Sequence, residues 1–317
     1  MICWRTKLNH LSNLIILGIL LCVATIVATV TNMLVLIIIA RMKKRSISYH
    51  ILLSLATADF FVGLILGPIT AIQVFDVMLL ENCLTHTIRS CFLILLVGSS
   101  LSSLALVAYD RYLLLTKLHN YNKYMTKKKV IIFILLSWFV PGIIPIARQF
   151  NMTAFVVLRV AVYTLPLVAL IVFYFLITMD VRKKERNLSR HQINQNVAGS
   201  DNSSTCENSN SHETAVVEIK RHYNFLNSGR KIKHIKLAKS VLLLIVCYFV
   251  SIFPLNIWMM LELANLNERM YSNLAHQIFY FGAIFLMQVN SCVNPVIYYL
   301  KKKEIRRGFH QIFKKRL

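Results

Sequence analysis

The chain has 317 residues, of which 56% are hydrophobic and only 15% are charged, and its formal net charge is +23. A soluble globular domain carries about 25% charged residues, so these values exclude an ordinary soluble protein and indicate a polytopic membrane protein. Within lipid every backbone polar group must bond internally. Long unbroken apolar runs therefore predict membrane-spanning helices and exclude a β-barrel.

Apolar runs longer than about 18 residues, the length that crosses a bilayer as a helix, recur from one end of the chain to the other. The run nearest the N-terminus is too long for a signal peptide, and no small-residue cleavage site follows a short apolar core. The predicted spans, in chain order, are residues 13–40, 47–75, 84–116, 127–148, 156–181, 234–264 and 272–300. We therefore expect an all-α fold, a seven-transmembrane helix bundle that occupies residues 13–300.

The basic residues lie almost entirely on one side of the predicted spans. Of the 36 Lys and Arg residues, 30 fall in the segments 41–46, 111–129 and 182–239 and in the tail from Lys301. Basic loops stay in the cytoplasm, so we expect a plasma-membrane protein with a short extracellular N-terminus, residues 1–12, and a cytoplasmic C-terminus. Topology and attraction to anionic lipid then account for the positive charge, and nucleic acid is not expected as a partner.

The longest predicted loop, residues 187–230, contains the stretch NQNVAGSDNSSTCENSNSHE, which is polar and nearly free of apolar residues. Such a composition cannot bury a core, so this third cytoplasmic loop is expected to be disordered. Phosphorylation of its serines and a role as an inert linker are both open.

The tail at 301–317, KKKEIRRGFHQIFKKRL, alternates basic clusters with apolar residues. Ile305, Phe309, Ile312 and Phe313 recur at helical spacing. This pattern predicts a short amphipathic eighth helix that lies on the cytoplasmic leaflet of the membrane.

A charged triplet, Asp110-Arg111-Tyr112, ends the third predicted span, and Asn294-Pro295 followed by Tyr298 lies in the seventh. The spans between and before them carry Asn32, Asp59, Trp138, Pro166 and Tyr174. This set, in this order, resembles the rhodopsin-like (class A) family of G-protein-coupled receptors over almost the whole chain outside residues 187–230. The resemblance implies a receptor with a heterotrimeric G protein, and arrestin, as cytoplasmic partners.

Asp59 is the one acid well inside an apolar run, where a charge costs at least a few kcal/mol. It therefore requires polar neighbours, and the candidates are Ser100, Asn290, Ser291 and Asn294. The resemblance implies that these side chains and Asp59 surround a sodium ion, and oxygen ligands with one carboxylate suit such a hard cation. A hydrogen-bonded cluster that holds water and no ion is the alternative.

The adjacent opposite charges at the end of the third span predict an activation switch. Asp110 is expected to neutralise Arg111 while the receptor rests. The resemblance implies that a helix movement releases Arg111 toward a G protein and that two tyrosines turn to meet it. The predicted switch residues are Asp110, Arg111, Tyr112, Tyr174, Asn294, Pro295 and Tyr298.

The sixth predicted span departs from the family pattern. It carries Ser-Ile-Phe-Pro at 251–254, where the family has Cys-Trp-x-Pro, so Ile252 replaces the tryptophan that senses ligand. A receptor that is constitutively active, or that does not signal, is therefore an alternative. A membrane transporter is the rival from another class, but the chain shows no internal repeat of the kind that transporters carry.

The short predicted outer loops point to a small extracellular ligand that binds inside the bundle. Arg89 and Arg159 lie in the outer halves of otherwise apolar spans, and arginine binds carboxylate or phosphate through a forked pair of hydrogen bonds. An anionic ligand or lipid fits this pattern, and simple snorkelling of both arginines to the outer headgroups is equally open. The candidate ligand-binding residues are Arg89, Leu93, Ile94, Val97, Arg159, Leu255, Asn256, Met259, Tyr280, Ile284 and Gln288.

Asn151-Met152-Thr153 is an acceptor sequence for N-glycosylation on a predicted outer loop, so we expect a glycan on Asn151. The sequence contains no paired-carboxylate, Ser-His-Asp or phosphate-loop arrangement. We therefore do not expect an enzyme, and sodium at Asp59 is the only ion that we expect.

Overall fold

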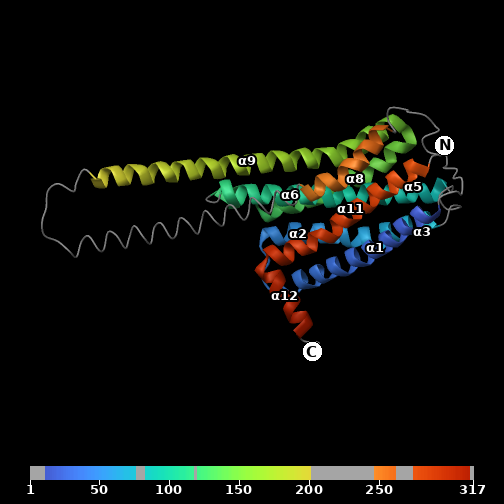
Figure 1. Cartoon of the computed structure of the whole chain (residues 1–317), viewed down its shortest axis with the longest axis horizontal. Coiled ribbons are helices and arrows are strands. Elements are labelled where there is room, and N and C mark those ends of the chain that lie inside the picture. Colours follow the sequence, from blue (N-terminus) through green and yellow to red (C-terminus); the bar gives the residue numbers. More distant parts are fainter. Residues whose placement is uncertain (1–10, 76–82, 118–119, 201–245, 262–273, 315–317) are drawn as a thin grey trace.

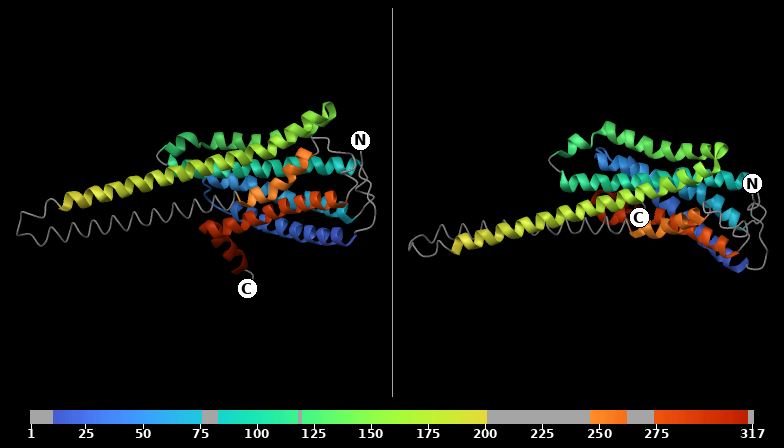
Figure 2. Two further views of the ribbon diagram at one scale, coloured as in Figure 1. Left: turned by 45° about the horizontal axis from the view of Figure 1, so that its top comes forward. Right: turned by 90° about the horizontal axis from the view of Figure 1, so that it is seen from above.

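The computed structural model describes residues 11–75, 83–117, 120–200, 246–261 and 274–314. Helices and no strands occur within these ranges, and most of the helices run side by side (Figures 1 and 2). In chain order they are α1 (Leu11–Ala40), α2 (Ile47–Phe61), η1 (Val62–Leu66), α3 (Gly67–Phe75), α5 (Cys83–Phe92), η2 (Leu93–Val97), α6 (Gly98–Thr116), α7 (Tyr121–Tyr124), α8 (Lys127–Phe150), α9 (Met152–Ser200), the helix Val246–Leu261, α11 (Leu274–Lys301) and α12 (Lys303–Lys314).

The helices confirm the predicted membrane bundle. Six of the described helices are long and apolar enough to cross a bilayer, and Val246–Leu261 is a shorter apolar helix within the predicted span 234–264. The remainder of that span and the predicted N-terminal segment up to residue 10 lie outside the described residues. Helix α12 agrees with the predicted amphipathic eighth helix.

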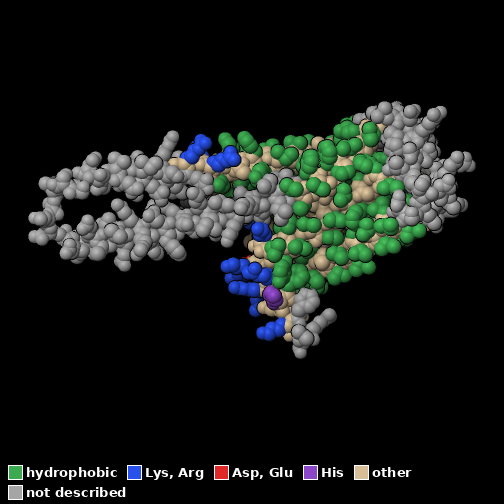
Figure 3. Space-filling model, in the orientation of Figure 1, with side chains coloured by type: hydrophobic (Ala, Val, Ile, Leu, Met, Phe, Trp, Pro, Cys, Tyr) green, Lys and Arg blue, Asp and Glu red, His purple; other side chains and the backbone are tan. Residues whose placement is uncertain are grey.

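The outside of the bundle is apolar, as a lipid-facing surface must be. Ile16 and Ile26 of α1, Leu135 of α8 and Leu165 of α9 are among the exposed large hydrophobic side chains. Figure 3 shows hydrophobic side chains over most of the described part of the bundle, with Lys and Arg gathered at one end and along α12. This separation agrees with a bundle that crosses a bilayer with its basic end in the headgroup region.

Two wide, π-helical turns interrupt the second and third spans. In η1 the amide of Gly67 bonds to the carbonyl of Val62, and the next residue is Pro68. Proline has no N–H for the preceding turn, so a local rearrangement of the ladder is expected there. No proline accounts for η2, which begins four residues after Arg89. Neither turn could be read from the apolar pattern.

Helix α9 differs from the sequence prediction at its end. It continues as a helix over residues 187–200, which were expected to be disordered, and Figure 1 shows it extending well beyond the other labelled helices. This part of the segment contains no proline, and extending an existing helix requires no new nucleation. The rest of the predicted disordered loop, residues 201–230, lies outside the described residues.

The second and third spans lie at the centre of the arrangement. Helix α2 packs against α1, α6 and α8, while α6 packs against α9 and α8, and α1 packs against α11. The crossing of α6 with α8 and α9 depends on Gly98. A Cβ at that position would lie 2.8 Å from Pro141 Cβ and 2.8 Å from Val162 Cγ1.

Replacing Gly98 with Ala is expected to destabilise the protein by about 1–3 kcal/mol, because the added methyl group overpacks this crossing. The measurement is the melting temperature of the purified protein in detergent. Gly282→Ala is the matched control, since a Cβ there meets no atom within 4 Å and Ala favours a helix over Gly. An equal fall in melting temperature for both variants would contradict the close packing at Gly98.

Candidate functional site

A buried carboxylate at the middle of the second span joins three helices. Asp59 of α2 is 0% exposed, and its Oδ1 accepts hydrogen bonds from Ser100 Oγ of α6 at 2.7 Å and from Ser291 Oγ of α11 at 2.8 Å. Its Oδ2 accepts from Asn294 Nδ2 at 2.7 Å. Three of the four predicted neighbours of Asp59 therefore contact it, which gives a buried charge the hydrogen bonds that it requires.

Free acceptor oxygens accompany this cluster. The side-chain oxygens of Asn294 and Asn32 are buried and have no hydrogen-bond partner, while Asn32 Nδ2 donates to the Ser291 carbonyl at 3.0 Å. Asn290, the fourth predicted neighbour, is also buried, but no hydrogen bond joins it to Asp59. An ionised carboxylate offers about four lone-pair sites, of which three are used here, so the oxygen set has capacity for a hard cation.

A second buried carboxylate lies at the basic end of the bundle. Asp110 of α6 is 1% exposed, and its oxygens accept hydrogen bonds from Ser48 Oγ at 2.8 Å and from Tyr121 Oη at 2.7 Å. Arg111 Nη2 lies 3.5 Å from Asp110 Oδ2, and the Arg111 side chain is 17% exposed. Asp110 thus ties α6 to the start of α2 and to the short helix α7, and it faces the guanidinium that follows it in the chain.

The donors around Asp110 are matched to an ionised carboxylate. Burial, followed by the hydrogen bond to Asp110, raises the pKa of the Tyr121 hydroxyl, which therefore stays protonated and keeps donating at neutral pH. Two neutral groups, the hydroxyls of Ser48 and Tyr121, donate hydrogen bonds to Asp110. Arg111 is therefore not the only group that stabilises the charge of this carboxylate. Neither Ser48 nor Tyr121 belongs to a pattern that would predict this role from the sequence.

The junction of α11 and α12 brings another cation close to this cluster. Burial, followed by repulsion from Arg111, lowers the pKa of Lys302 from 10.5 to about 8. The Lys302 ammonium lies 5.1 Å from the ring centroid of Tyr49, whose hydroxyl donates to Glu304 at 3.0 Å. The positive charge around Arg111 therefore favours its interaction with Asp110.

The two tyrosines expected to join the switch differ in their surroundings. Tyr298 of α11 is buried and its hydroxyl has no hydrogen-bond partner, whereas Tyr174 of α9 is half-buried. Within the described part of the chain, the Tyr298 hydroxyl has no hydrogen bond to Arg111. Tyr112 instead stacks on Phe173 of α9, with ring centroids 5.8 Å apart.

A chain of polar side chains connects the second, third and fourth spans between the two carboxylates. Trp138 Nε1 donates to Ser54 Oγ at 3.0 Å, and Ser54 and Ser103 share a hydrogen bond of 3.1 Å. Ser54 precedes Asp59 on α2, and Ser103 lies between Ser100 and Asp110 on α6. These hydrogen bonds hold α2, α6 and α8 together between the two carboxylates.

The outer half of the bundle contains a buried arginine. Arg89 of α5 is 1% exposed, and its Nε and Nη1 have no hydrogen-bond partner among the residues that the structure describes. Its guanidinium carbon lies 4.9 Å from the ring centroid of Tyr280 and 5.7 Å from that of Phe281, both on α11. The arginine is therefore directed into the bundle, against α11, and not toward the outer surface.

Most of the other predicted ligand-binding residues are also inside the bundle. Arg159 of α9 is buried and lies over the ring of Phe155, with its guanidinium carbon 5.3 Å from the centroid. The apolar candidates are all buried: Leu93, Ile94, Val97, Leu255, Met259 and Ile284. Asn256 has a buried side-chain oxygen without a partner. Gln288 is directed to α1, where its Nε2 donates to Thr25 Oγ1 at 2.6 Å.

The sixth span contains a tryptophan, Trp258, at a position other than the one at which the family has its tryptophan. Trp258 is buried, and its ring centroid lies 5.3 Å from that of Tyr280, the same ring that Arg89 contacts. Ile252, which replaces the expected tryptophan, is buried as well. Its neighbour Tyr248 donates to the Tyr163 carbonyl of α9 at 2.9 Å. These contacts join the helix Val246–Leu261 to α9 and α11.

Asn151, the predicted glycosylation site, lies between α8 and α9. It is exposed, and its Oδ1 accepts a hydrogen bond from the Ala154 amide at 3.0 Å, which caps the start of α9. Among the described residues no group of three or more His, Cys, Asp or Glu side chains gathers as a metal site of that kind would require.

The chain is similar to known receptors over most of its length. Residues 31–153 and 142–298 match the family described as 7 transmembrane receptor (rhodopsin family). It is 26% identical over 294 residues to the adenosine receptor A3 of Canis lupus familiaris, covering 84% of this chain and 80% of that receptor. It is 21% identical over 322 residues to the alpha-1A adrenergic receptor of Oryzias latipes, covering 94% of this chain and 66% of that receptor. It is 24% identical over 306 residues to the cannabinoid receptor 1 of Xenopus laevis, covering 89% of this chain and 59% of that receptor.

Proposed function

Because this chain belongs to the rhodopsin family of seven-transmembrane receptors, we propose that it activates a heterotrimeric G protein when a small ligand binds within the outer half of its bundle. It is a class A receptor and a multi-pass membrane protein, and its relatives are receptors rather than enzymes. The observation that carries the proposal is the buried Asp110, which holds Arg111 at the basic end of the bundle. The proposed setting is the plasma membrane, with the N-terminus outside the cell and that basic end inside.

The resting state is held by the contacts of Asp110. The carboxylate takes hydrogen bonds from Ser48 and Tyr121 and faces Arg111, so it fixes α6 against α2 and α7. Breaking a buried charge cluster of this kind costs several kcal/mol, so the arrangement is maintained until another partner compensates. A G protein that enters at this end would supply that partner for Arg111.

The unpaired hydroxyl of Tyr298 supports the active half of the mechanism. A buried hydroxyl without a partner is unfavourable by about 1–3 kcal/mol. The Tyr298 hydroxyl is in this unfavourable state among the described residues. It would form a hydrogen bond if the helices moved to bring it to Arg111. Asn294 and Pro295 precede it on α11, and Asn294 is already bonded to Asp59, which links the two carboxylate sites. Tyr174 is the second tyrosine proposed to approach Arg111.

A sodium ion is proposed at Asp59. The residues that would hold it are Asp59, Ser100 and the free side-chain oxygen of Asn294, with Ser291 and Asn290 beside them. Sodium would neutralise the carboxylate and draw α2, α6 and α11 together, which favours the resting arrangement.

The proposed ligand is anionic. A buried guanidinium whose N–H groups are unpaired is costly, and a carboxylate or phosphate group would satisfy them with the strongest hydrogen bonds available. The Nε and Nη1 atoms of Arg89 are such unpaired donors among the described residues, and Arg159 adds a second buried cation in the same half of the bundle. The apolar side chains of η2 and of the helix Val246–Leu261 suit a ligand with a hydrophobic portion, such as a lipid acid.

The aromatic contacts offer a route from this ligand to the sixth span. Arg89 lies against Tyr280, and Tyr280 lies against Trp258. A ligand that draws Arg89 away from Tyr280 would change the packing of Trp258. This contact would take the place of the tryptophan that is absent at Ile252.

Replacing Tyr121 with Phe is expected to raise basal G-protein activation about tenfold or more, because a hydrogen bond to a charged group contributes about 1.5–3 kcal/mol and only the resting state makes it. The measurement is nucleotide exchange in membranes at matched receptor amounts. Tyr124→Phe is the control, since Tyr124 lies in the same short helix but is exposed. No rise with Tyr121→Phe, or an equal rise with Tyr124→Phe, would contradict the proposed role of Asp110.

The ligand proposal predicts that Arg89→Gln raises the half-maximal concentration of an active carboxylate or phosphate compound about 30-fold or more, because a buried charged pair is worth about 2–5 kcal/mol. The compound comes from a screen of fatty acids, lysophospholipids and small organic acids. Arg148→Gln serves as the control, since Arg148 is a half-buried arginine at the end of α8. Equal potency on the wild type and Arg89→Gln would exclude the anion site.

Sodium is expected to raise the melting temperature of the purified wild-type protein relative to choline at equal ionic strength, since a bound ion stabilises the folded state. Asp59→Asn is expected to remove this difference, while Asp180→Asn, which changes an acid on α9, a helix that gives no hydrogen bond to Asp59, keeps it. A sodium effect that survives in Asp59→Asn would show that the ion binds elsewhere or that the cluster holds only water.

A further inference from the structure

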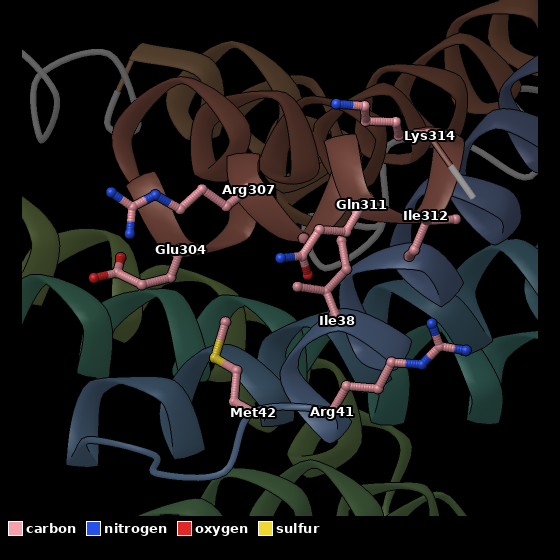
Figure 4. A pocket seen from close by; sticks show the side chains of 9 residues that line it. Ile38, Arg41, Met42, Glu304, Arg307, Gln311, Ile312 and Lys314 are labelled. Carbon is pink, nitrogen blue, oxygen red and sulfur yellow. The ribbon is translucent and has the colours of Figure 1, made fainter. Parts of the chain in front are cut away.

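A cleft lies between the end of α1 and the amphipathic helix α12. Its volume is about 690 Å³, within the 300–1,000 Å³ range of small-ligand sites, and its walls come from residues far apart in the sequence. It is lined by Ile38, Arg41, Met42, Glu304, Arg307, Gly308, Gln311, Ile312 and Lys314. Figure 4 shows Ile38 and Met42 from α1 and the following turn on one side and the α12 side chains on the other.

The cleft is a consequence of how α12 is anchored. Ile305 is fully buried, and Phe309 packs edge-on against Tyr299 of α11, with ring centroids 5.5 Å apart. Gly308 lets the helix lie directly on α1, because a Cβ at that position would overlap the side chain of Ile38. The cleft lies beside this contact, with Gly308 and Ile38 both in its lining.

The charges that line the cleft are mostly positive and are not neutralised by the protein. Arg41, Arg307 and Lys314 are exposed, and none of them forms an ion pair within the described part of the chain. The single acid is Glu304, whose carboxylate accepts a hydrogen bond from Tyr49 at 3.0 Å. A backbone hydrogen bond, followed by the one from Tyr49, lowers the pKa of Glu304, so it is ionised at neutral pH. One acid against three bases leaves the cleft positive.

The position of the cleft determines which anion can reach it. The exposed apolar face of α1 ends near its last turn, and the basic residues begin at Arg41, so the cleft lies at the depth of the lipid headgroups. We propose that it binds the phosphorylated headgroup of an acidic membrane lipid, with Arg41 and Arg307 contacting the phosphate groups and Ile38 and Met42 facing the acyl-chain side. The assignment of this lipid to the cytoplasmic leaflet rests on the proposed orientation of the receptor. The binding of the lipid to the cleft does not depend on that orientation.

The side chains favour a headgroup with several phosphate groups over one with a single carboxylate. Arginine binds phosphate through two parallel hydrogen bonds, and basic clefts beside membrane helices select multiply charged inositol phosphate headgroups. Figure 4 shows the guanidinium groups of Arg41 and Arg307 at opposite ends of the cleft, with the amide of Gln311 between them. A headgroup with phosphates at separate positions can contact both ends with phosphate groups, whereas phosphatidylserine offers one phosphate and one carboxylate, and its own ammonium group offsets one of these charges.

The test uses the full-length receptor in phosphatidylcholine nanodiscs that contain either phosphatidylinositol bisphosphate or enough phosphatidylserine to give the same charge. A short-chain fluorescent phosphatidylinositol bisphosphate is the probe. Wild-type receptor is expected to bind it, and unlabelled phosphatidylinositol bisphosphate is expected to compete at least about tenfold better than phosphatidylserine. Both faces of the bundle are accessible in a nanodisc, so the result does not depend on orientation or on G-protein coupling.

Two double variants, each of which removes two positive charges, distinguish specific binding of the probe at the cleft from general electrostatic attraction of acidic lipid to basic residues. Arg41→Gln with Arg307→Gln is expected to weaken probe binding about tenfold or more, since the charge-assisted hydrogen bonds of both arginines are lost. Lys127→Gln with Lys128→Gln, which changes exposed lysines at the start of α8, is expected to change it less than about twofold, because those charges are screened at a distance. Melting temperatures establish that both variants fold.

Equal losses in the two double variants would overturn the inference, because they would show diffuse attraction of basic residues to acidic lipid. Equal competition by phosphatidylserine and phosphatidylinositol bisphosphate would also overturn it. Should the double arginine variant fail to fold, Arg41→Lys with Arg307→Lys retains the charge but loses the forked geometry. That variant is expected to bind the probe more weakly than wild type, and unchanged binding would count against the site.

Discussion

A carboxylate inside a membrane bundle must be solvated by the protein itself, and this constraint organises the structure. Asp59 receives its hydrogen bonds from α6 and α11, and Asp110 receives them from α2 and α7. Neither charge can lose these contacts without a cost of several kcal/mol. Each acid therefore fixes the relative position of helices that are far apart in the sequence, and any movement of those helices must provide replacement partners.

The same constraint explains how the two ends of the bundle are related. Ser54, Ser103 and Trp138 bridge the helices between the two acids, so the spacing of α2, α6 and α8 is set along much of their length. In the outer half the buried charge is positive. Among the described residues, the guanidinium of Arg89 lies against the aromatic rings of Tyr280 and Phe281. In the proposed mechanism, a ligand anion supplies a partner to the buried Arg89, and a G protein supplies one to the partly exposed Arg111.

The sequence predicted the number and limits of most helices because long apolar runs and basic loops are strong, local signals. It also predicted four polar neighbours for Asp59, since a buried acid must find donors. Ser100, Ser291 and Asn294 form hydrogen bonds to it, and Asn290 does not. The sequence could not predict Ser48 and Tyr121 as partners of Asp110, because these residues lie in separate segments and have no distinctive pattern. The wide turns η1 and η2, the helical continuation over residues 187–200 and the contact of Trp258 with Tyr280 depend on backbone adjustment and packing, which periodicity does not encode. The close approach of α12 to α1 beside the cleft likewise depends on one glycine, Gly308, which no sequence pattern distinguishes.

The most direct test of the central claim, that Asp110 restrains Arg111 until a G protein replaces it, is guanine-nucleotide exchange by a panel of purified heterotrimers with purified receptor in nanodiscs. The comparison is between Asp110→Asn alone and Asp110→Asn combined with Arg111→Ala, at matched receptor concentration and without ligand. The account predicts faster exchange than wild type for the single variant and loss of that increase in the double variant. Exchange by the double variant as fast as by the single variant would contradict it, because Arg111 would then have no part in activating the G protein.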